Sequence, residues 1–416
     1  MTPMKNGHFP IGFWNYPAVG AYGPEEVARW TRCGMTWNQS PRFSYDVNTP
    51  GQLLALLDEC EKQNIQMTLC VKGLDYRDAG RDPEAYRALF ERAYRDFGHH
   101  PATAGFFIGD EPVGEEQNRA CIEAYRIMLS TAPELTPFLN FFPYHEGFEK
   151  NILGGQRFSD WAKEFTAASS CRLICYDCYN QMNEGEEGTD FYFLNLNKYS
   201  EMARDAGIEV WTTLLSSAHF LYRPVSEDDV RWQLSTAVAS GCRGILWFFF
   251  YDKLANNNYR CSPIDPFGEE TETYHYLRRV QKVFHAMYGD LMMKLKWKKT
   301  FHFEKAYGGY PLFAPGDHPI ILRVVSEQKL AGVLSFFEDE QGREYVCLVN
   351  NSPFKPGSFN FVLRKDTGKV LRIRENGTQE VDFKAFHHDA AYRETENEII
   401  AGCCLAPGQM EIFRFE

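Results

Sequence analysis

The sequence lacks any long apolar run. A helix that crosses a bilayer needs about 20 apolar residues, whereas the run Ile245–Tyr251 has only the length of a strand. Residues Met1–Phe9 also lack the basic segment followed by an apolar segment that marks a secretory signal. We therefore expect a cytoplasmic protein with no membrane partner.

Positive charge is scarce as well. The 44 Lys and Arg residues are outnumbered by 56 Asp and Glu residues, which gives a net charge of −12. Because nucleic acids and anionic membranes attract basic surfaces, this balance argues against both as partners.

Motifs of several site classes are missing. No G-x-G-x-x-G follows the first apolar segment and no G-x-S-x-G occurs, so neither a dinucleotide fold nor a serine-hydrolase elbow is indicated. The 12 cysteines match no zinc spacing, and we predict buried free thiols in a reducing compartment. We predict no metal and no cofactor, and we expect the pair His387–His388 to lie in an exposed loop.

Eight apolar segments alternate with amphipathic helical segments over the first part of the chain. Continuous apolar runs are typical of buried parallel strands. Strand–helix alternation repeated eight times predicts an α/β fold, a (β/α)₈ TIM barrel, with a doubly wound open sheet as the alternative. The predicted strands are Ile11–Trp14, Met35–Asn38, Ile65–Lys72, Ala104–Gly109, Pro137–Phe142, Leu173–Tyr176, Ile208–Leu215 and Gly244–Tyr251.

The pattern changes near residue 295. Short alternating segments separated by Gly, Pro and Asn turns follow, which predicts a small all-β sandwich. We therefore predict a barrel over residues 1–295 and a sandwich over residues 296–416. The acids at 338–340 are predicted to form a solvated hairpin tip rather than a calcium site.

The segment Thr103–Pro112 is the most informative part of the sequence. An apolar strand runs into two adjacent carboxylates, Asp110 and Glu111, and Pro112 then ends the strand. The carboxyl ends of strands carry the chemistry in parallel α/β folds. Adjacent acids could also cap the next helix, but at this place they favour general acid/base catalysis.

Polar and aromatic side chains follow the other predicted strands. Together they form a ring of amide, phenol, indole and carboxylate groups that suits a neutral polyhydroxylated ligand, and aromatic residues make up 15% of the chain, which suits stacking against sugars. The candidate substrate-binding residues are Asn15, Tyr16, Asn38, Lys72, Asp110, Tyr179, Asn180, Trp247, Tyr251 and Asp252.

Two acids are candidates for catalysis. Glycoside hydrolysis uses a pair of carboxyl groups across a sugar ring, and Glu111 after the fourth strand and Asp177 after the sixth could form such a pair. Asp177 could instead orient the substrate or a neighbouring tyrosine. Asp110 is expected to support Glu111, because successive strand residues point in opposite directions.

These motifs resemble the clan A glycoside hydrolases, a superfamily of retaining (β/α)₈ glycosidases. The resemblance is carried by Gly109-Asp110-Glu111-Pro112, by Tyr176-Asp177-Cys178-Tyr179 and by the unit Arg231–Phe248. It is greatest to glycosidase-like proteins of gut bacteria that carry a β-sandwich tail. The resemblance implies a carbohydrate substrate and places Glu111 as the general acid/base.

One departure from the clan is evident. Its nucleophile is a glutamate that ends the seventh strand, but here that strand ends Leu214-Leu215-Ser216-Ser217 with no acid. Either Asp177 or another acid replaces it, or the enzyme is inverting, or the barrel binds sugars without cleaving them. A fourth reading is a hexosaminidase-like mechanism in which Asp110 orients a substrate acetamide and Glu111 is the acid.

Overall fold

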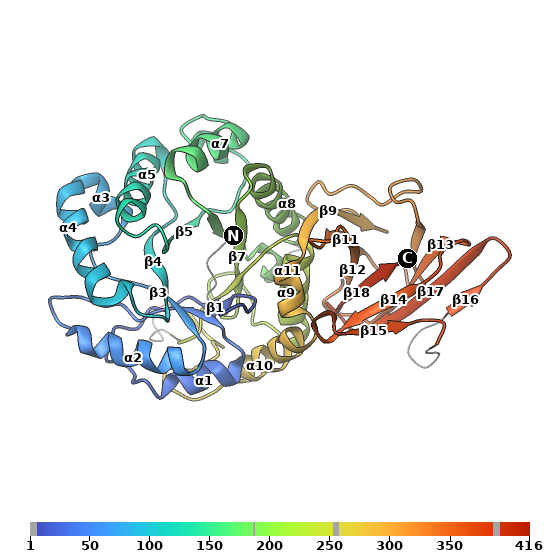
Figure 1. Cartoon of the computed structure of the whole chain (residues 1–416), viewed down its shortest axis with the longest axis horizontal. Coiled ribbons are helices and arrows are strands. Elements are labelled where there is room, and N and C mark those ends of the chain that lie inside the picture. Colours follow the sequence, from blue (N-terminus) through green and yellow to red (C-terminus); the bar gives the residue numbers. More distant parts are fainter. Residues whose placement is uncertain (1–5, 186–187, 253–257, 386–391) are drawn as a thin grey trace. The chain divides into compact units, whose positions relative to one another are not determined.

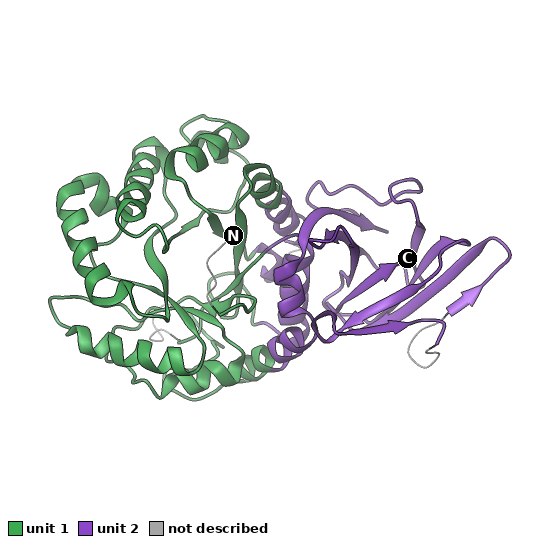
Figure 2. Ribbon diagram, in the orientation of Figure 1, with its two compact units in different colours: residues 1–179, 198–224, 243–278 green, residues 180–197, 225–242, 279–416 purple. Residues whose placement is uncertain are grey.

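The computed structural model describes residues 6–185, 188–252, 258–385 and 392–416. The pair His387–His388 therefore lies outside the described residues. The chain divides into two compact units (Figure 2), the first formed by residues 1–179, 198–224 and 243–278 and the second by residues 180–197, 225–242 and 279–416. The predicted domain boundary at residue 295 stays a prediction.

Eight parallel strands form one sheet in the first unit (Figure 1). They run in the order β1-β8-β7-β6-β5-β4-β3-β2, and the N–H of Thr36 donates to the carbonyl of Ile11 (2.8 Å) where β2 and β1 meet. The predicted barrel is thereby confirmed and the open sheet excluded. The strands are β1 Ile11–Phe13, β2 Trp37–Gln39, β3 Gln66–Leu69, β4 Thr103–Asp110, β5 Thr136–Phe141, β6 Leu173–Asp177, β7 Glu209–Leu215 and β8 Ile245–Phe248.

Helices alternate with these strands along the chain. Asp82 caps the start of α4 by accepting from the N–H of Ala85, and Ser226 and Asp229 form a capping box at the start of α9. The helices are α1 Glu26–Cys33, α2 Pro50–Lys62, α3 Tyr76–Arg81, α4 Pro83–Ala93, α5 Gly114–Thr131, α6 Phe148–Asn151, α7 Phe158–Ser169, α8 Thr189–Ala206, α9 Glu227–Ala239, α10 Glu272–Phe284 and α11 Asp290–Lys294. Within the described ranges, none of them combines the length and apolar character that a bilayer crossing requires.

Large aromatic side chains fill the interior of the barrel. Trp37 and Trp211 meet edge to face with ring centroids 5.1 Å apart, and Phe138 packs against both. The cluster continues through Trp14, Leu246 and Phe249 toward the carboxyl ends of the strands. Because the interior is packed, the carboxyl ends of the strands are where a binding site is expected.

The remaining strands form two antiparallel sheets, which confirms the predicted sandwich. One sheet has the order β10-β13-β17-β16 and the other β15-β14-β18-β12-β11-β9. The acids predicted at a hairpin tip lie at the turn between β11 and β12, where Asp339 accepts from the N–H of Gln341. The strands are β9 Lys296–Phe303, β10 Ile321–Ser326, β11 Gly332–Glu338, β12 Glu344–Asn350, β13 Gly357–Arg364, β14 Val370–Arg374, β15 Gln379–Asp382, β16 Tyr392–Glu394, β17 Glu398–Leu405 and β18 Met410–Phe415.

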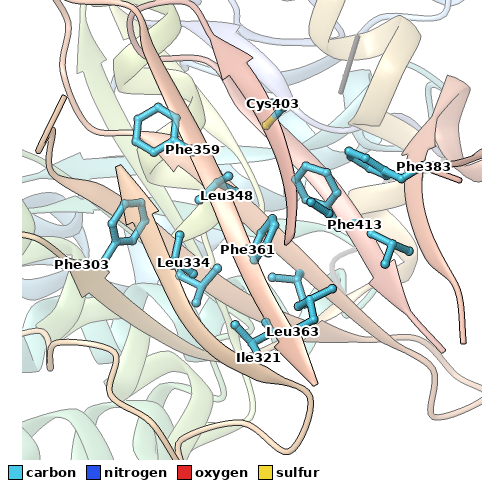
Figure 3. Packing of buried hydrophobic residues seen from close by; sticks show 14 of the residues in the cluster. Phe303, Ile321, Leu334, Leu348, Phe359, Phe361, Leu363, Phe383, Cys403 and Phe413 are labelled. Carbon is cyan, nitrogen blue, oxygen red and sulfur yellow. The ribbon is translucent and has the colours of Figure 1, made fainter. Parts of the chain in front are cut away.

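The core of the sandwich lies between its two sheets (Figure 3). Phe359, Phe361 and Leu363 project from β13 toward Leu334 and Leu348 of the other sheet, and all five are buried. Their alternation along β13 follows the pleat, because every second residue of a strand faces the same side. Ten of the 12 cysteines are buried and all are free thiols, as the sequence predicts.

Within the second unit, α9 packs against the sandwich. The indole N–H of Trp232 donates to Oδ1 of Asn351 (2.7 Å), and the hydroxyl of Thr300 donates to the carbonyl of Ala239 (3.1 Å). Gly408 lies so close to Trp232 that an added Cβ would be 2.5 Å from its backbone. The turn before β18 therefore has no room for a larger residue.

Truncation after Leu295 removes the sandwich and leaves the apolar face of α9, including Trp232, without its cover. We expect insoluble or unstable protein, because exposed apolar patches of this kind drive aggregation. Solubility and thermal denaturation measure the outcome. As a milder control, Asn351→Ala should stay soluble but lose about 1–3 kcal/mol, the cost of leaving the buried Trp232 N–H unpaired. A soluble and equally stable truncated barrel would contradict this account.

Candidate active site

The carboxyl end of β4 departs from regular strand geometry. Phe107 pairs with Phe138 and Gly109 with Leu139, so β4 holds one extra residue at this point and forms a bulge. Gly109 has a φ of 142°, and a Cβ there would lie 2.3 Å from the ring of Tyr76. Only glycine fits this position.

The bulge decides where the paired acids point. Asp110 follows the bulge and pairs with Asn140, and Glu111 then adopts a left-handed φ of 48°. As a result both carboxyl groups line one cavity of about 470 Å³. Regular alternation ends at the bulge, so strand geometry no longer requires these two neighbours to point in opposite directions, and the supporting role of Asp110 stays a prediction.

Asn140 joins the acids of two strands. It lies on β5, and its Nδ2 donates to Oδ1 of Asp110 (3.0 Å) and to Oδ1 of Asp177 (2.7 Å). Asp177 ends β6 and is partly exposed. One amide group thus holds the carboxyl groups that follow the fourth and sixth strands of the barrel.

Sequence reasoning missed Asn140 because it considered only residues beyond the strand ends. The signal was present: Asn140 is a polar residue inside the apolar run Pro137–Phe142. A buried amide in a barrel strand needs partners, and here those partners are the two acids.

All three carboxyl groups have raised pKa values. Burial raises the pKa of Glu111 to about 8, and the charges of Asp177 and Asp110 add to the rise. Burial and the charge of Asp110 raise the pKa of Asp177 to about 7 against the opposing hydrogen bonds from Asn140 and Tyr179. Burial likewise raises the pKa of Asp110 to about 6. Near neutral pH the cluster therefore holds protons that isolated carboxyl groups would have lost.

Aromatic rings stand beside the acids. Tyr179 hydrogen-bonds Asp177 and stacks on Phe248 with centroids 5.5 Å apart. Tyr16 meets Phe248 edge to face at 6.0 Å and lines the cavity. Such faces are suited to stacking against a sugar ring.

The rest of the cavity wall combines predicted and unpredicted residues. Asn15, Tyr16, Asp110 and Glu111 were predicted, and Gln39 was expected beside Asn38 after the second strand, whereas the two arginines were not among the candidates. The lining residues are Trp14, Asn15, Tyr16, Gln39, Arg42, Cys70, Asp75, Arg77, Phe107, Asp110, Glu111 and Phe142.

Two amide atoms of this wall are buried without a partner among the described residues. They are Oδ1 of Asn15 and Nε2 of Gln39. The other atoms of the two side chains are held, since Asn15 Nδ2 donates to the hydroxyl of Tyr22 (2.6 Å) and Gln39 Oε1 accepts from the Asn15 N–H (3.3 Å). Unsatisfied buried amides cost stability and are typical of functional sites.

Two predicted residues face away from the barrel interior. Trp37 belongs to the interior cluster and Gln39 lines the cavity, so Asn38 between them points outward. Trp247 lies in the same way between Leu246 and Phe248, which pack in the interior. In β2 the inward-facing residue is Gln39 instead of Asn38, and in β8 it is Phe248 instead of Trp247.

Other predicted residues also lie outside the cavity wall. Lys72 is 70% exposed and pairs with Asp46 (2.8 Å). The hydroxyl of Tyr251 donates to Glu26 (2.9 Å), and the backbone N–H of Asp252 donates to the carbonyl of Ile264 (2.8 Å). Asn180 begins a short turn in the second unit, and its role in binding stays a prediction.

The end of β7 holds no acid, and its serines have structural partners. The hydroxyl of Ser216 donates to the carbonyl of Phe249 (3.1 Å), and Ser217 and Ser262 share a hydrogen bond (2.8 Å). In the described part of the chain, no group of three or more His, Cys, Asp or Glu residues is placed to hold a metal ion.

Comparison with known proteins gives structural matches only. No protein-family model matches this chain, and no curated protein sequence matches it. A solved glycoside hydrolase is similar with a TM-score of 0.58 at 10% identity, covering 98% of this chain and 92% of that one. A family 39 glycoside hydrolase of the gut symbiont Bacteroides cellulosilyticus has a TM-score of 0.51 at 10% identity, covering 99% and 82%. A glucosidase of Croceicoccus marinus has a TM-score of 0.50 at 12% identity, covering 98% and 95%.

At these identities the likeness shows the fold and not the activity. The fold expected from the sequence is confirmed at that level: this chain has a (β/α)₈ barrel and a β-sandwich, and it is similar in fold to these solved glycoside hydrolases.

Proposed function

We propose that this protein is a glycoside hydrolase that cleaves oligosaccharides or glycosides by carboxylic acid/base catalysis. The observation that carries the proposal is that Asp110 and Glu111 line one cavity and that Asn140 joins Asp110 to Asp177 at the same end of the barrel. Paired carboxyl groups with separated protonation states are the equipment of this reaction.

The two catalytic roles follow from the pKa values. Glu111 has the highest pKa of the three, about 8, so it keeps a proton near neutral pH and is the proton donor to the leaving oxygen. Asp177 loses its proton before Glu111 does, near pH 7, and supplies the second carboxylate. Asp110 is held by Asn140 and orients the substrate or its neighbour Glu111.

Two alternatives use the same residues. The bare end of β7 favours a barrel that binds carbohydrate without cleaving it. The position of Asp110 next to Glu111 on one cavity wall favours a hexosaminidase-like enzyme in which the substrate acetamide is the nucleophile. Turnover of aryl hexosides without an acetamido group would exclude both alternatives, and turnover of N-acetylhexosaminides alone would favour the second.

Replacing Glu111 with Gln removes the proposed proton donor without changing the size of the side chain. We expect kcat to fall by about 10²–10⁴-fold, and to fall more for alkyl glycosides than for dinitrophenyl glycosides, whose leaving groups need no proton. Steady-state kinetics on both kinds of substrate measure the effect. The matched control, Glu116→Gln on the exposed start of α5, should keep full activity. If Glu111→Gln turned over substrate as fast as the parent protein, Glu111 would not be the proton donor.

The pH profile should be a bell with its maximum between about pH 7 and 8. Activity rises as Asp177 ionises near pH 7 and falls as Glu111 loses its proton near pH 8. In Asn140→Leu the hydrogen bond that lowers the pKa of Asp177 is lost, so the acid limb should move to higher pH while the alkaline limb moves less. Profiles of kcat/KM for the two proteins test this. An unmoved acid limb would show that Asp177 does not set it.

Asp177→Asn should stabilise the protein at high pH. The folded-state pKa of Asp177 is raised, so the stability that this group contributes is present below its unfolded pKa near 4 and is lost as the pH rises through about 7. We expect the variant to gain about 0.5–2 kcal/mol at pH 9 and little at pH 4, while losing activity. Denaturant unfolding at both pH values measures the difference. If the variant were less stable than the parent at pH 9, burial of the ionised Asp177 carboxylate would not destabilise the parent protein as proposed.

A further inference from the structure

We propose that the sugar bound in this cavity carries an anionic substituent, a carboxylate or a sulfate ester, and that Arg42 recognises it. The inference rests on the proposed glycosidase site and names its substrate class. It depends on three observations: where Arg42 lies, what fixes it there, and which partner it lacks.

The backbone of Arg42 is fixed, and the residue is exposed and lines the cavity. It follows β2, and its backbone pairs with the segment after β1: its N–H donates to the carbonyl of Pro17 (2.8 Å) and its carbonyl accepts from the N–H of Val19 (3.0 Å). The guanidinium lies over the ring of Tyr16, 5.3 Å from its centroid. Both residues line the cavity.

Apart from its contact with the ring of Tyr16, the guanidinium of Arg42 has no partner among the described residues. Among the described residues it makes no side-chain hydrogen bond, and no carboxylate lies within ion-pair distance, although the charge of Arg42 lowers the pKa of Asp110 from further away. The neighbouring Arg77 differs, because it pairs with Asp75 (3.3 Å) and donates to the carbonyl of Asp110 (3.4 Å). Arg42 is therefore the arginine of this wall whose donors remain available.

An arginine that lines a binding cavity and has no hydrogen-bond acceptor among the described residues favours an anionic ligand. A bound sugar would cover Arg42 and remove water from it, and a desolvated cation without a counter-charge is costly. A carboxylate or sulfate offsets that cost, since the planar fork of five N–H donors matches such groups with two parallel hydrogen bonds. The proton retained by Glu111 near neutral pH reduces the repulsion that an anionic sugar would otherwise meet.

The experiment uses the full chain and matched pairs of sugars. Methyl glucuronide and methyl galacturonide, and glucose 6-sulfate and galactose 6-sulfate, are compared with the methyl glycosides of glucose and galactose by calorimetric titration. We expect the better anionic sugar to bind at least about tenfold more tightly than its neutral partner, and this preference should weaken in 0.5 M NaCl. Whether the uronide or the sulfate shows the preference identifies the substituent.

Variants assign the preference to Arg42. Arg42→Gln should abolish it, and Arg42→Lys, which keeps the charge but loses the fork, should retain only part of it. The control Arg157→Gln alters an exposed arginine of α7's start that pairs with Asp160 and should keep the full preference. Equal binding of anionic and neutral sugars by the parent protein, or an unchanged preference in Arg42→Gln, would overturn the proposal.

The two proposals fail in different ways. Suppose that neutral aryl glycosides are turned over in a Glu111-dependent way and that uronides and sulfated sugars bind no better. The glycoside hydrolase proposal would then be supported and the anionic substrate proposal refuted. If an anionic sugar binds in an Arg42-dependent way but its aryl glycosides are not turned over, the proposed ligand class would be supported and the proposed hydrolase activity refuted.

Discussion

Three carboxyl groups share one end of the barrel, and like charges so close together cannot all ionise at neutral pH. The amide of Asn140 makes the arrangement possible, since it donates to Asp110 and Asp177 at once. Glu111 receives no such hydrogen bond from Asn140 and has the highest pKa of the three. The hydrogen bond from Asn140 lowers the pKa of Asp177, and Glu111 lacks it, so Glu111 keeps its proton at a pH where Asp177 releases its own.

The backbone at the end of β4 positions the side chains of Asp110 and Glu111. The bulge before Gly109 turns Asp110 toward Asn140, and the left-handed conformation of Glu111 brings the next carboxyl group to the same cavity. Such conformations cost free energy and persist only where the surrounding structure holds them. Here the packed aromatic interior of the barrel provides a rigid support beneath the site.

The candidate site could be predicted in part. Glu111, Asp110 and Tyr16 line the cavity because residues at strand ends meet at one end of a barrel, whatever the details of packing. Asn38 and Trp247 were predicted at the site but face outward. Side chains alternate between the two faces of a sheet, so the sequence does not tell which alternate set of residues faces inward until one residue of the strand is placed. Arg42 lies three residues beyond β2, and only the pairing of its backbone with residues 17–19 brings it to the cavity.

The sequence by itself determined the architecture. Eight apolar strands separated by helices, then short strands separated by turns, allow few packed arrangements, because each element must bury its apolar face. Glu111 was also determined, since a strand that runs into Asp-Glu-Pro must end there. The tertiary structure decided which side of each strand faces the cavity, that one amide serves two acids from different strands, and that Arg42 lines the cavity with no hydrogen-bond acceptor among the described residues. These facts depend on contacts between residues that are distant in the chain, and no local pattern of sequence encodes them.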